Sequence, residues 1–301
     1  MNEKNGTEDA CMRYAGVDIG ATSIKIGLVD SEKGLLDTTS FPSFPGDAEK
    51  LAEEIALRVR EMDVCAIGVG TAGSVHLDTE LVYASNLKWW GVPFRKHLEE
   101  KSKLPVWVDN DAQSAMMAEV FDGALQGVKN GIYLTIGTGI GGAILINGKP
   151  WRSSNNVGAE FGHMIIHGDG EPCPCKRRGC FERYASANAL SRMAGGLSAR
   201  DVFDGAQNGD THLQNILESY YRELAIGMVS IVSIFNPDVI AIGGGVSAAG
   251  EVLLRGIERA FDEQMSGRKD FFKGQFRLAR HRNSAGVLGA AMLAKYHFSE
   301  E

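Results

Sequence analysis

The sequence has no hydrophobic segment long enough to cross a membrane. Its longest apolar run, at residues 224–235, is well short of the roughly 20 residues that a bilayer requires, and it ends at Asn236-Pro237-Asp238. Residues 1–13 are polar and lack the apolar stretch of a secretory signal. We therefore expect a cytoplasmic protein that makes no contact with a membrane.

The chain also lacks an excess of positive charge. Its 31 lysines and arginines are outnumbered by 38 aspartates and glutamates, which gives a formal net charge of −7. A broad basic surface that binds nucleic acid is therefore not expected. One short basic run, Lys176-Arg177-Arg178, lies among cysteines, and we interpret it as a solvated turn rather than a nucleic-acid contact.

Cysteine is scarce, with five residues in the chain, yet Cys173, Cys175 and Cys180 lie close together and follow His163 in the spacing H-x9-C-x-C-x4-C. Without a signal sequence, such a cluster binds metal more often than it forms disulfides. One imidazole and three thiolates suit a closed tetrahedral zinc site, and the zinc would be structural because no coordination position stays open. The alternative is a set of free surface thiols.

Glycine is abundant, at 37 residues, and it recurs in two similar places. Residues 14–30 read as a strand, a glycine turn and a second strand, and residues 131–150 repeat this order. With an offset of 117 residues and no gap, Ile19-Gly20 aligns with Ile136-Gly137, and Leu28-Val29 aligns with Leu145-Ile146. The pattern predicts two copies of one nucleotide-handling unit, although glycine turns between Ile/Val strands also arise by chance.

The remaining pattern alternates strands with helices, which is typical of an α/β protein. Asp47 precedes a helical stripe formed by Leu51, Ile55 and Val59. A final helix carries Gly286, Gly289 and Ala290 along one side, and this arrangement predicts close packing of that face. The other expected elements are strands at 64–70, 105–111 and 239–242 and a helix at 111–127.

Both glycine turns are suited to hold phosphate. In the first, Asp18 ends a strand beside Gly20 and Thr22, so that backbone N–H groups and a hydroxyl can bind phosphate while the carboxylate holds Mg²⁺ through water. The second turn, at residues 137–142, offers further backbone donors. Neither is a P-loop, and a strand rather than a helix follows, which excludes a dinucleotide fingerprint.

Asp109-Asn110-Asp111 precedes the helix expected at 111–127. Asn and Asp are preferred helix caps, which explains one of the three residues. Alternatively, one Asp is a general base. A helix N-terminus favours the ionised carboxylate, so Asp111 would remain able to accept a proton.

Together these motifs resemble the ROK family of bacterial sugar kinases and repressors, within the actin/hexokinase/Hsp70 superfamily. The resemblance covers roughly residues 14–295 and is carried, in the family's order, by DIGATSIK (18–25), NLKWW (86–90), VDNDAQSA (108–115), TIGTGIGGAILING (135–148), GAEFGHM (158–164), CPCKRRGCFE (173–182) and IGGGVS (242–247).

The resemblance implies a two-lobed, actin-like ATPase fold of the α/β class. It consists of duplicated ribonuclease-H-like lobes, with ATP and sugar in the cleft between them and with a zinc-binding loop. On this basis we expect a small lobe at 14–112 plus 285–301 and a large lobe at 113–284, with the zinc loop at 163–182. Residues 1–13 would form an N-terminal tail.

The resemblance also implies site residues and partners. Asp111 corresponds to the catalytic base, and the expected cofactors are ATP, catalytic Mg²⁺ and structural Zn²⁺, in a homodimer. The implied sugar ligands are Asn86, Asn110, Asp111, Glu160, His163 and Glu182. The implied zinc ligands are His163, Cys173, Cys175 and Cys180. The implied nucleotide-binding residues are Asp18, Gly20, Thr22, Lys25, Gly137, Thr138, Gly139, Gly141, Gly243, Gly244 and Gly245.

Three positions depart from the family's usual pattern. Gln113 replaces an Asn, and Lys176 and Ala21 each replace a Gly. None of the three removes a reacting group. A residue other than glycine resists positive φ, so Lys176 and Ala21 put the local geometry of their loops in question.

The function implied is ATP-dependent phosphorylation of the 6-hydroxyl of an aldohexose, with D-glucose favoured. Alternatives are a kinase for N-acetylmannosamine, N-acetylglucosamine, mannose or allose, a sugar-responsive repressor, or a non-catalytic sugar sensor. A repressor of this family carries a helix-turn-helix domain before the first glycine turn, where this sequence has 17 residues before Asp18. A sensor would be expected to lose the base, and Asp111 is present.

Overall fold

The computed structural model describes residues 12–266 and 270–299, so the expected N-terminal tail lies almost entirely outside the described residues. The chain divides into two compact units. Unit 1 comprises residues up to Ala118 together with those from Asn283 onward, and unit 2 comprises Glu119–Arg282. The chain passes from one unit to the other within helix α3 (Asp111–Asp122) and again after Arg282.

Unit 1 is built on a five-stranded sheet in the order β3-β2-β1-β4-β8. Strands β1 (Arg13–Ile19), β2 (Ser23–Asp30) and β3 (Gly34–Pro42) are antiparallel, whereas β4 (Ile67–Thr71) and β8 (Val106–Asn110) run parallel to β1. Strands β5 (Ser74–Val75), β6 (Val82–Ala84) and β7 (Trp89–Val92) form a small second sheet, with the short helix η1 (Ser85–Leu87) between β6 and β7.

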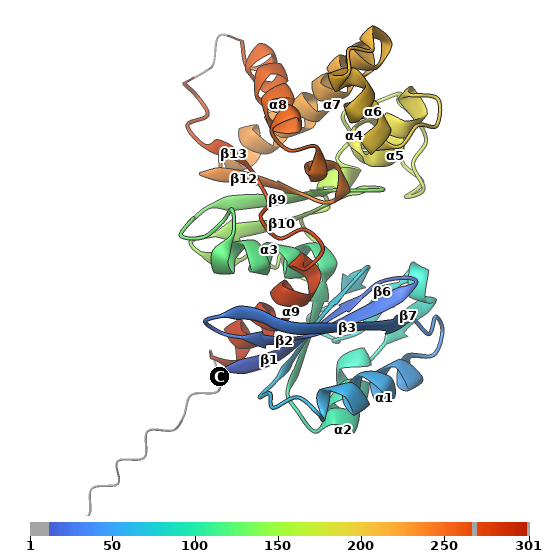
Figure 1. Cartoon of the computed structure of the whole chain (residues 1–301), viewed down its shortest axis with the longest axis vertical. Helices are drawn as coiled ribbons and strands as arrows, with labels where there is room; N and C mark the ends of the chain where they lie inside the picture. Colours follow the sequence, from blue (N-terminus) through green and yellow to red (C-terminus); the bar gives the residue numbers. More distant parts are fainter. Residues whose placement is uncertain (1–11, 267–269, 300–301) are drawn as a thin grey trace, which may run out of the picture. The chain divides into compact units, whose positions relative to one another are not determined.

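Helices cover both faces of the sheet of unit 1. Helices α1 (Ala48–Val59) and α2 (Phe94–Ser102) pack together on one face, and α9 (Ala285–Phe298) covers the other (Figure 1). The expected helix start is confirmed, because the Asp47 side chain accepts a hydrogen bond from the Lys50 N–H. Leu51, Ile55 and Val59 are buried in the core of this unit, as their helical spacing predicts.

Helix α9 lies unusually close to its neighbours, as its glycines predict. A Cβ at Gly289 would lie 1.6 Å from the Ser114 carbonyl oxygen in α3. On the sheet side, a Cβ at Gly16 would lie 1.9 Å from the Val287 oxygen, and one at Gly68 would lie 1.7 Å from the Ala290 oxygen. Only glycine at these positions allows the backbones to approach this closely.

Unit 2 repeats the strand order of unit 1. Its sheet runs β11-β10-β9-β12-β13, with β9, β10 and β11 antiparallel and with β12 and β13 parallel to β9. The strands are β9 (Gly131–Ile136), β10 (Ile140–Ile146), β11 (Lys149–Pro150), β12 (Val239–Gly243) and β13 (Gln275–Leu278). The predicted duplication of one unit is therefore confirmed by matching sheets.

The gapless alignment of the two hairpins is wrong by one residue in the second strand. Ala15 pairs with Leu28 in the first hairpin, and the equivalent Ile132 pairs with Ile144 rather than with Leu145. The reason is the turn. Residues 20–23 separate the paired residues Ile19 and Ile24 in the first hairpin, whereas only residues 137–139 separate Ile136 and Ile140 in the second.

The helices of unit 2 gather around its longest helix, α7 (Thr211–Phe235), which ends at Asn236 in a left-handed cap. The others are α4 (Glu182–Ala185), α5 (Ala187–Met193), α6 (Ala199–Gln207) and α8 (Glu251–Gln264), with the short helices η2 (Phe161–His163) and η3 (Gly245–Ala249). Across residues 12–266 and 270–299, no helix is long and apolar enough to span a bilayer.

Helix α3 is shorter than the expected 111–127 and ends at Asp122. The carboxylate of Glu119 is fully buried and accepts the backbone N–H groups of Ala124, Arg280 and His281. These bonds satisfy the buried charge and turn the chain away from the helix axis.

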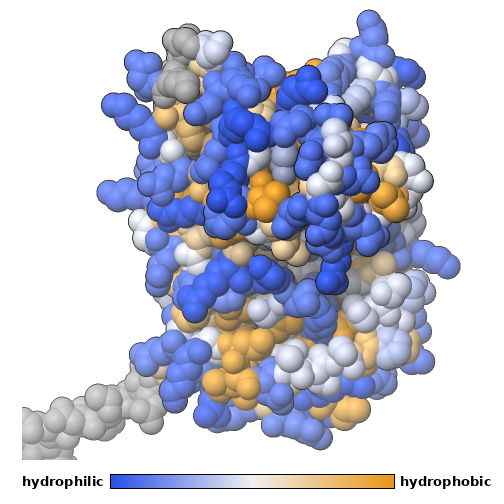
Figure 2. Space-filling view, turned by 45° about the horizontal axis from the view of Figure 1, so that its top comes forward, coloured by the Kyte–Doolittle hydropathy of each residue, from blue (hydrophilic) through white to orange (hydrophobic). Residues whose placement is uncertain are grey.

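The visible surface is largely hydrophilic, with separate hydrophobic patches between the polar side chains (Figure 2). The most exposed large apolar side chains include Trp90, at 74%, and Ile234, at 69%. They belong to different elements, β7 and α7.

Candidate active site

In unit 1, the predicted polar residues gather where parallel strands end. Asp18 of β1 and Asp109 of β8 both lie level with Gly70 of β4 in the sheet register. Asn110 ends β8, and Asp111 opens α3 directly after it. The carboxyl edge of a parallel sheet is where α/β folds commonly bind ligands.

Asp18 is half-buried, and its carboxylate faces α9 at a glycine. A Cβ at Gly286 would lie 2.6 Å from the carboxyl carbon of Asp18. Burial raises the pKa of Asp18, and the charge of Lys25, its cross-strand neighbour, partly opposes this increase. Such a carboxylate gains from a cation, which is the chemistry expected of a Mg²⁺ partner.

Asn110 and Asp111 have different roles at the start of α3. The Asn110 side chain accepts the Ala112 N–H and donates to the Gly73 carbonyl, so it acts as the helix cap and is held in place. Asp111 is exposed, and its Oδ1 also accepts the Ala112 N–H at 2.8 Å. The cap therefore explains Asn110, while the Asp111 side chain lies at the surface of unit 1.

The first glycine turn is closed by its own backbone and exposes its tip. The Gly20 N–H donates to the Ser23 carbonyl, while Ala21 and Thr22 are exposed. Ala21 is not among the residues with positive φ, so its replacement of glycine costs no backbone strain. Asn86 lies in η1 with an exposed side chain.

In unit 2, two glycine segments lie together at the carboxyl ends of adjacent strands. The turn after β9 is closed by a Gly137 N–H to Gly139 carbonyl bond, and Thr138 at its tip is exposed. Gly244 follows β12, and a Cβ there would lie 2.5 Å from the Ile136 oxygen. The two segments thus lie side by side.

A pocket of about 430 Å³ opens beside Gly245. Helix α6 lines it with Arg200, Phe203, Asp204 and Gln207, and η3 lines the other side. Sequence reasoning missed this pocket because no motif marks residues 199–207. An aromatic ring beside polar groups suits a nucleobase next to a phosphate-binding loop.

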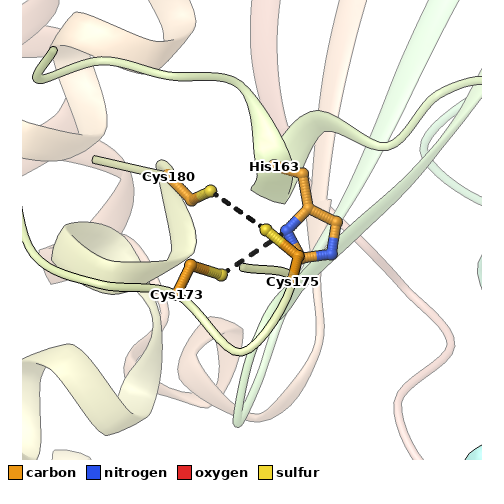
Figure 3. Close-up of side chains that lie close together, drawn as sticks. All are labelled: His163, Cys173, Cys175 and Cys180. Carbon is orange, nitrogen blue, oxygen red and sulfur yellow. Dashed lines mark hydrogen bonds between the residues drawn. The ribbon is translucent and has the colours of Figure 1, made fainter. Parts of the chain in front are cut away.

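The predicted zinc ligands converge. The ligand atoms of His163, Cys173, Cys175 and Cys180 all lie within 4.8 Å of one another. Figure 3 shows the Cys173 sulfur turned toward His163 Nδ1, at 3.8 Å, and the Cys175 sulfur toward that of Cys180, at 3.5 Å. Ligands about 2.3 Å from a tetrahedral zinc are separated by roughly this much, so the cluster fits the metal.

The pKa values of the three thiols are shifted in different directions. Burial is the main cause that raises the pKa of Cys173 to about 12, and burial also raises the pKa of Cys180. A hydrogen bond from Arg177 lowers the pKa of Cys175 to about 6. Arg177 of the basic run therefore stabilises a thiolate at Cys175.

The loop is also held from outside the ligand set, which sequence reasoning did not foresee. His167 Nε2 lies 2.7 Å from Glu223 Oε2 of α7, and Glu171 accepts hydrogen bonds from Arg183 and Arg192. These partners lie up to 56 residues apart in the chain, so no local motif signals them.

Two predicted sugar ligands flank the metal cluster. Glu182 begins α4 after the last cysteine, and its Oε1 lies 3.2 Å from the Cys173 sulfur and 3.7 Å from His163 Nδ1. Glu160 directly precedes η2 and is exposed. The structure thus brings Glu182 and His163 together and leaves the Glu160 carboxylate at the surface of unit 2.

The repeated sheet order and the glycine turns at strand ends define an α/β protein with the two-lobed, actin-like ATPase fold. The family model described as "ROK family" matches residues 14–297, and the chain belongs to this family. It is 34% identical to a glucokinase of Halalkalibacterium halodurans, over 94% of each chain.

Solved structures agree with this family. A ROK hexokinase from Thermus thermophilus superposes with a TM-score of 0.86 at 31% identity, covering 96% of this chain and 100% of that one. A ROK family glucokinase from Streptomyces griseus, in complex with glucose and AMPPNP, gives 0.82 at 34% identity, covering 94% and 99%.

Proposed function

We propose that the protein is an ATP-dependent hexose kinase that phosphorylates the 6-hydroxyl of an aldohexose, with D-glucose as the favoured sugar. The observation that carries this proposal is the exposed carboxylate of Asp111 on the first turn of α3. The similarity to a ROK glucokinase crystallised with glucose and AMPPNP supports the substrates.

Asp111 is proposed as the general base. The helix N-terminus favours an ionised carboxylate there, and the neighbouring Asn110 is held by its own bonds to Gly73 and Ala112. The carboxylate accepts the proton of the sugar 6-hydroxyl as the oxygen attacks the γ-phosphorus. The bond from that phosphorus to the β–γ bridging oxygen breaks, and ADP leaves. Phosphoryl transfer needs mainly positioning and electrostatic stabilisation, so one base suffices.

The nucleotide is proposed to bind along the glycine segments. The Gly139 N–H and the Thr22 and Thr138 hydroxyls are candidate phosphate ligands. Gly20 and Gly137, whose N–H groups close their own turns, would let phosphate approach closely, with Lys25, Gly141, Gly243 and Gly244 nearby in sequence. Gly245 leads into the α6 pocket, which would hold the base. Mg²⁺ bound with ATP would neutralise phosphate charge, and Asp18 is its candidate partner in the protein.

The sugar ligands are proposed to be Asn86 and Asn110 of unit 1 and Glu160, His163 and Glu182 of unit 2. Carboxylates suit hydroxyl donors. We assign unit 1 to the small lobe and unit 2 to the large lobe of the family's fold. A cytoplasmic location and a homodimer are proposed from the family resemblance.

Replacing the base tests the mechanism. Asp111→Asn keeps the size of the side chain but cannot accept a proton, so we expect kcat to fall by about 10²–10⁴-fold. Glucose affinity, measured by calorimetry, should stay within about tenfold because the amide still forms hydrogen bonds. Asp63→Asn, on an exposed loop residue, is the control. Near-normal turnover by Asp111→Asn would assign the base elsewhere.

A sugar panel in a coupled ADP-release assay tests the substrate. We expect glucose to have the highest kcat/KM, with mannose and 2-deoxyglucose weaker and fructose weakest. A site that hydrogen-bonds a hydroxyl can reject an analogue lacking it by about 10⁴-fold. If N-acetylmannosamine exceeds glucose by more than about tenfold, a difference of roughly 1.4 kcal/mol, the preference for glucose is wrong and the kinase mechanism stands.

A further inference from the structure

The carboxylate of Glu182 lies beside two parts of unit 2, the metal loop and the second glycine turn. In the proposed function the first shapes the sugar site and the second binds phosphate. Its Oε1 lies beside the zinc ligands Cys173 and His163, as described above. Its Oε2 lies only 2.7 Å from where a Cβ of residue 139 would stand, and residue 139 is glycine. One side chain therefore bridges the metal loop and the second glycine turn.

Backbone contacts reinforce this bridge. The Ala187 N–H, five residues after Glu182, donates to the Gly137 carbonyl at 2.8 Å. On the other side of the turn, a Cβ at Gly162 in η2 would lie 2.1 Å from the Ile140 oxygen. The segments that carry Glu182 and His163 thus both rest on the β9–β10 hairpin.

We propose that Gly139 is a positioning residue for Glu182, and that this contact couples the sugar site to the phosphate-binding turn. The inference rests on the proposed function, in which Glu182 binds sugar and the turn binds phosphate. Glycine at position 139 leaves the space that the carboxylate occupies, so a shift of Glu182 on sugar binding moves the turn.

Such a contact acts in both directions. A nucleotide that fixes the turn also fixes Glu182, so it changes sugar affinity by the same factor by which sugar changes nucleotide affinity. Packed interiors transmit small displacements because they contain little free space. Through this coupling, the conformation of the turn depends on whether a sugar is bound.

Gly139→Ala tests the contact, with Gly137→Ala as its matched control in the same turn. A Cβ at Gly137 meets nothing within 4 Å, and neither glycine has a positive φ. Calorimetry on the zinc-loaded protein without nucleotide should show glucose affinity about tenfold lower for Gly139→Ala. It should change less than about twofold for Gly137→Ala. Weaker ATP binding is compatible with the inference in both variants, because both substitutions lie in the proposed phosphate-binding turn.

A second measurement concerns the coupling itself. In the wild type, a saturating non-hydrolysable ATP analogue should change glucose affinity by a factor in the range of about 5–150. The factor should fall toward one in Gly139→Ala. Glu182→Asp keeps the charge but withdraws the carboxylate by one methylene, so it should also lower the factor. It therefore serves as the test if Gly139→Ala fails to fold.

The outcomes separate the inference from the proposed function. Equal effects of the two glycine variants on glucose affinity, or an unchanged coupling factor in Glu182→Asp, would overturn the positioning role while leaving a hexose kinase intact. A wild-type protein that binds none of the sugars in the panel would overturn the proposed function and the inference with it.

Discussion

Strained residues stand beside candidate ligands in three loops. Lys88, with φ 57°, follows Asn86 by two positions; Ala159, with φ 65°, precedes Glu160; and Lys176, with φ 69°, follows Cys175. A left-handed conformation costs a residue other than glycine or Asn/Asp about 1–2 kcal/mol. Strain of this kind persists only where the surroundings fix it, and it is concentrated at functional sites.

Lys176→Gly should relieve one of these strains. Removing the left-handed penalty stabilises by about 1–2 kcal/mol, while the freer unfolded chain destabilises by about 0.4–1 kcal/mol, so a net stabilisation of up to about 1.6 kcal/mol is expected. Urea denaturation of the zinc-loaded protein measures it. Lys33→Gly, at an exposed turn position without positive φ, should instead destabilise. A loss of stability in Lys176→Gly would show that the lysine side chain contributes more than its backbone costs.

Asp18→Asn should stabilise the protein at neutral pH while lowering its activity. Burial raises the pKa of Asp18, so the folded state holds its proton more firmly than the unfolded chain. Stability from this group therefore falls as pH rises from the ordinary value of 3.8 through the raised pKa. Calorimetric Tm should be higher for the variant at pH 7, and the difference should shrink toward pH 4. A lower Tm at pH 7 would mean that attraction to Lys25 outweighs desolvation.

At the scale of elements, local signals predict helix starts and hairpins well. Asp47 marks the start of α1, and the glycine between two β-branched strands marks each turn, because both depend on neighbouring residues. The end of α3 is not local. It depends on Glu119, whose carboxylate binds the N–H groups of Arg280 and His281 more than 160 residues away. Sequence spacing does not report such a contact.

Close packing of α9 predicts a large effect from one methyl group. In Gly289→Ala, the new Cβ would lie 1.6 Å from the Ser114 carbonyl oxygen, which is backbone and cannot rotate away. Helix α9 or α3 must shift, so we expect a loss of at least about 1–3 kcal/mol in stability, although alanine favours helices. Thermal unfolding measures it. Gly168→Ala, where a Cβ meets nothing within 4 Å, should change little. Equal stability of the two variants would contradict the close packing of α9.

At the scale of the whole molecule, the sequence predicts duplication from the hairpins alone. The matching order of β4 and β8 in unit 1 with β12 and β13 in unit 2 appears only in the sheets. Their parallel pairing is made by residues far apart in the chain, so self-similarity there leaves little trace. In contrast, all four residues of the metal cluster are predicted from the sequence. Three thiols and one imidazole at this spacing are typical of a metal site.

Removing zinc should weaken sugar binding, although no zinc ligand except His163 is a candidate sugar ligand. The ligands join η2, which carries His163, to the segment that leads from Cys180 through Phe181 to Glu182. Phe181 is fully buried against Gly227 of α7, so it anchors one side of this segment while the metal would hold the other. Structural zinc contributes directly to the free energy of folding of such loops.

We therefore expect one zinc per chain by elemental analysis. Cys175→Ser should lose the metal and raise the glucose KM by at least about tenfold, because a 1 Å displacement of a positioning group can cost about 10²-fold. The KM for ATP should change less, since Gly243 lies in β12 of the sheet of unit 2 and Gly137 directly follows β9. Treating the wild type with a zinc chelator in excess Mg²⁺ should reproduce the effect, and adding zinc back should reverse it. Fully active protein that contains no zinc would show that the cluster shapes no part of the sugar site.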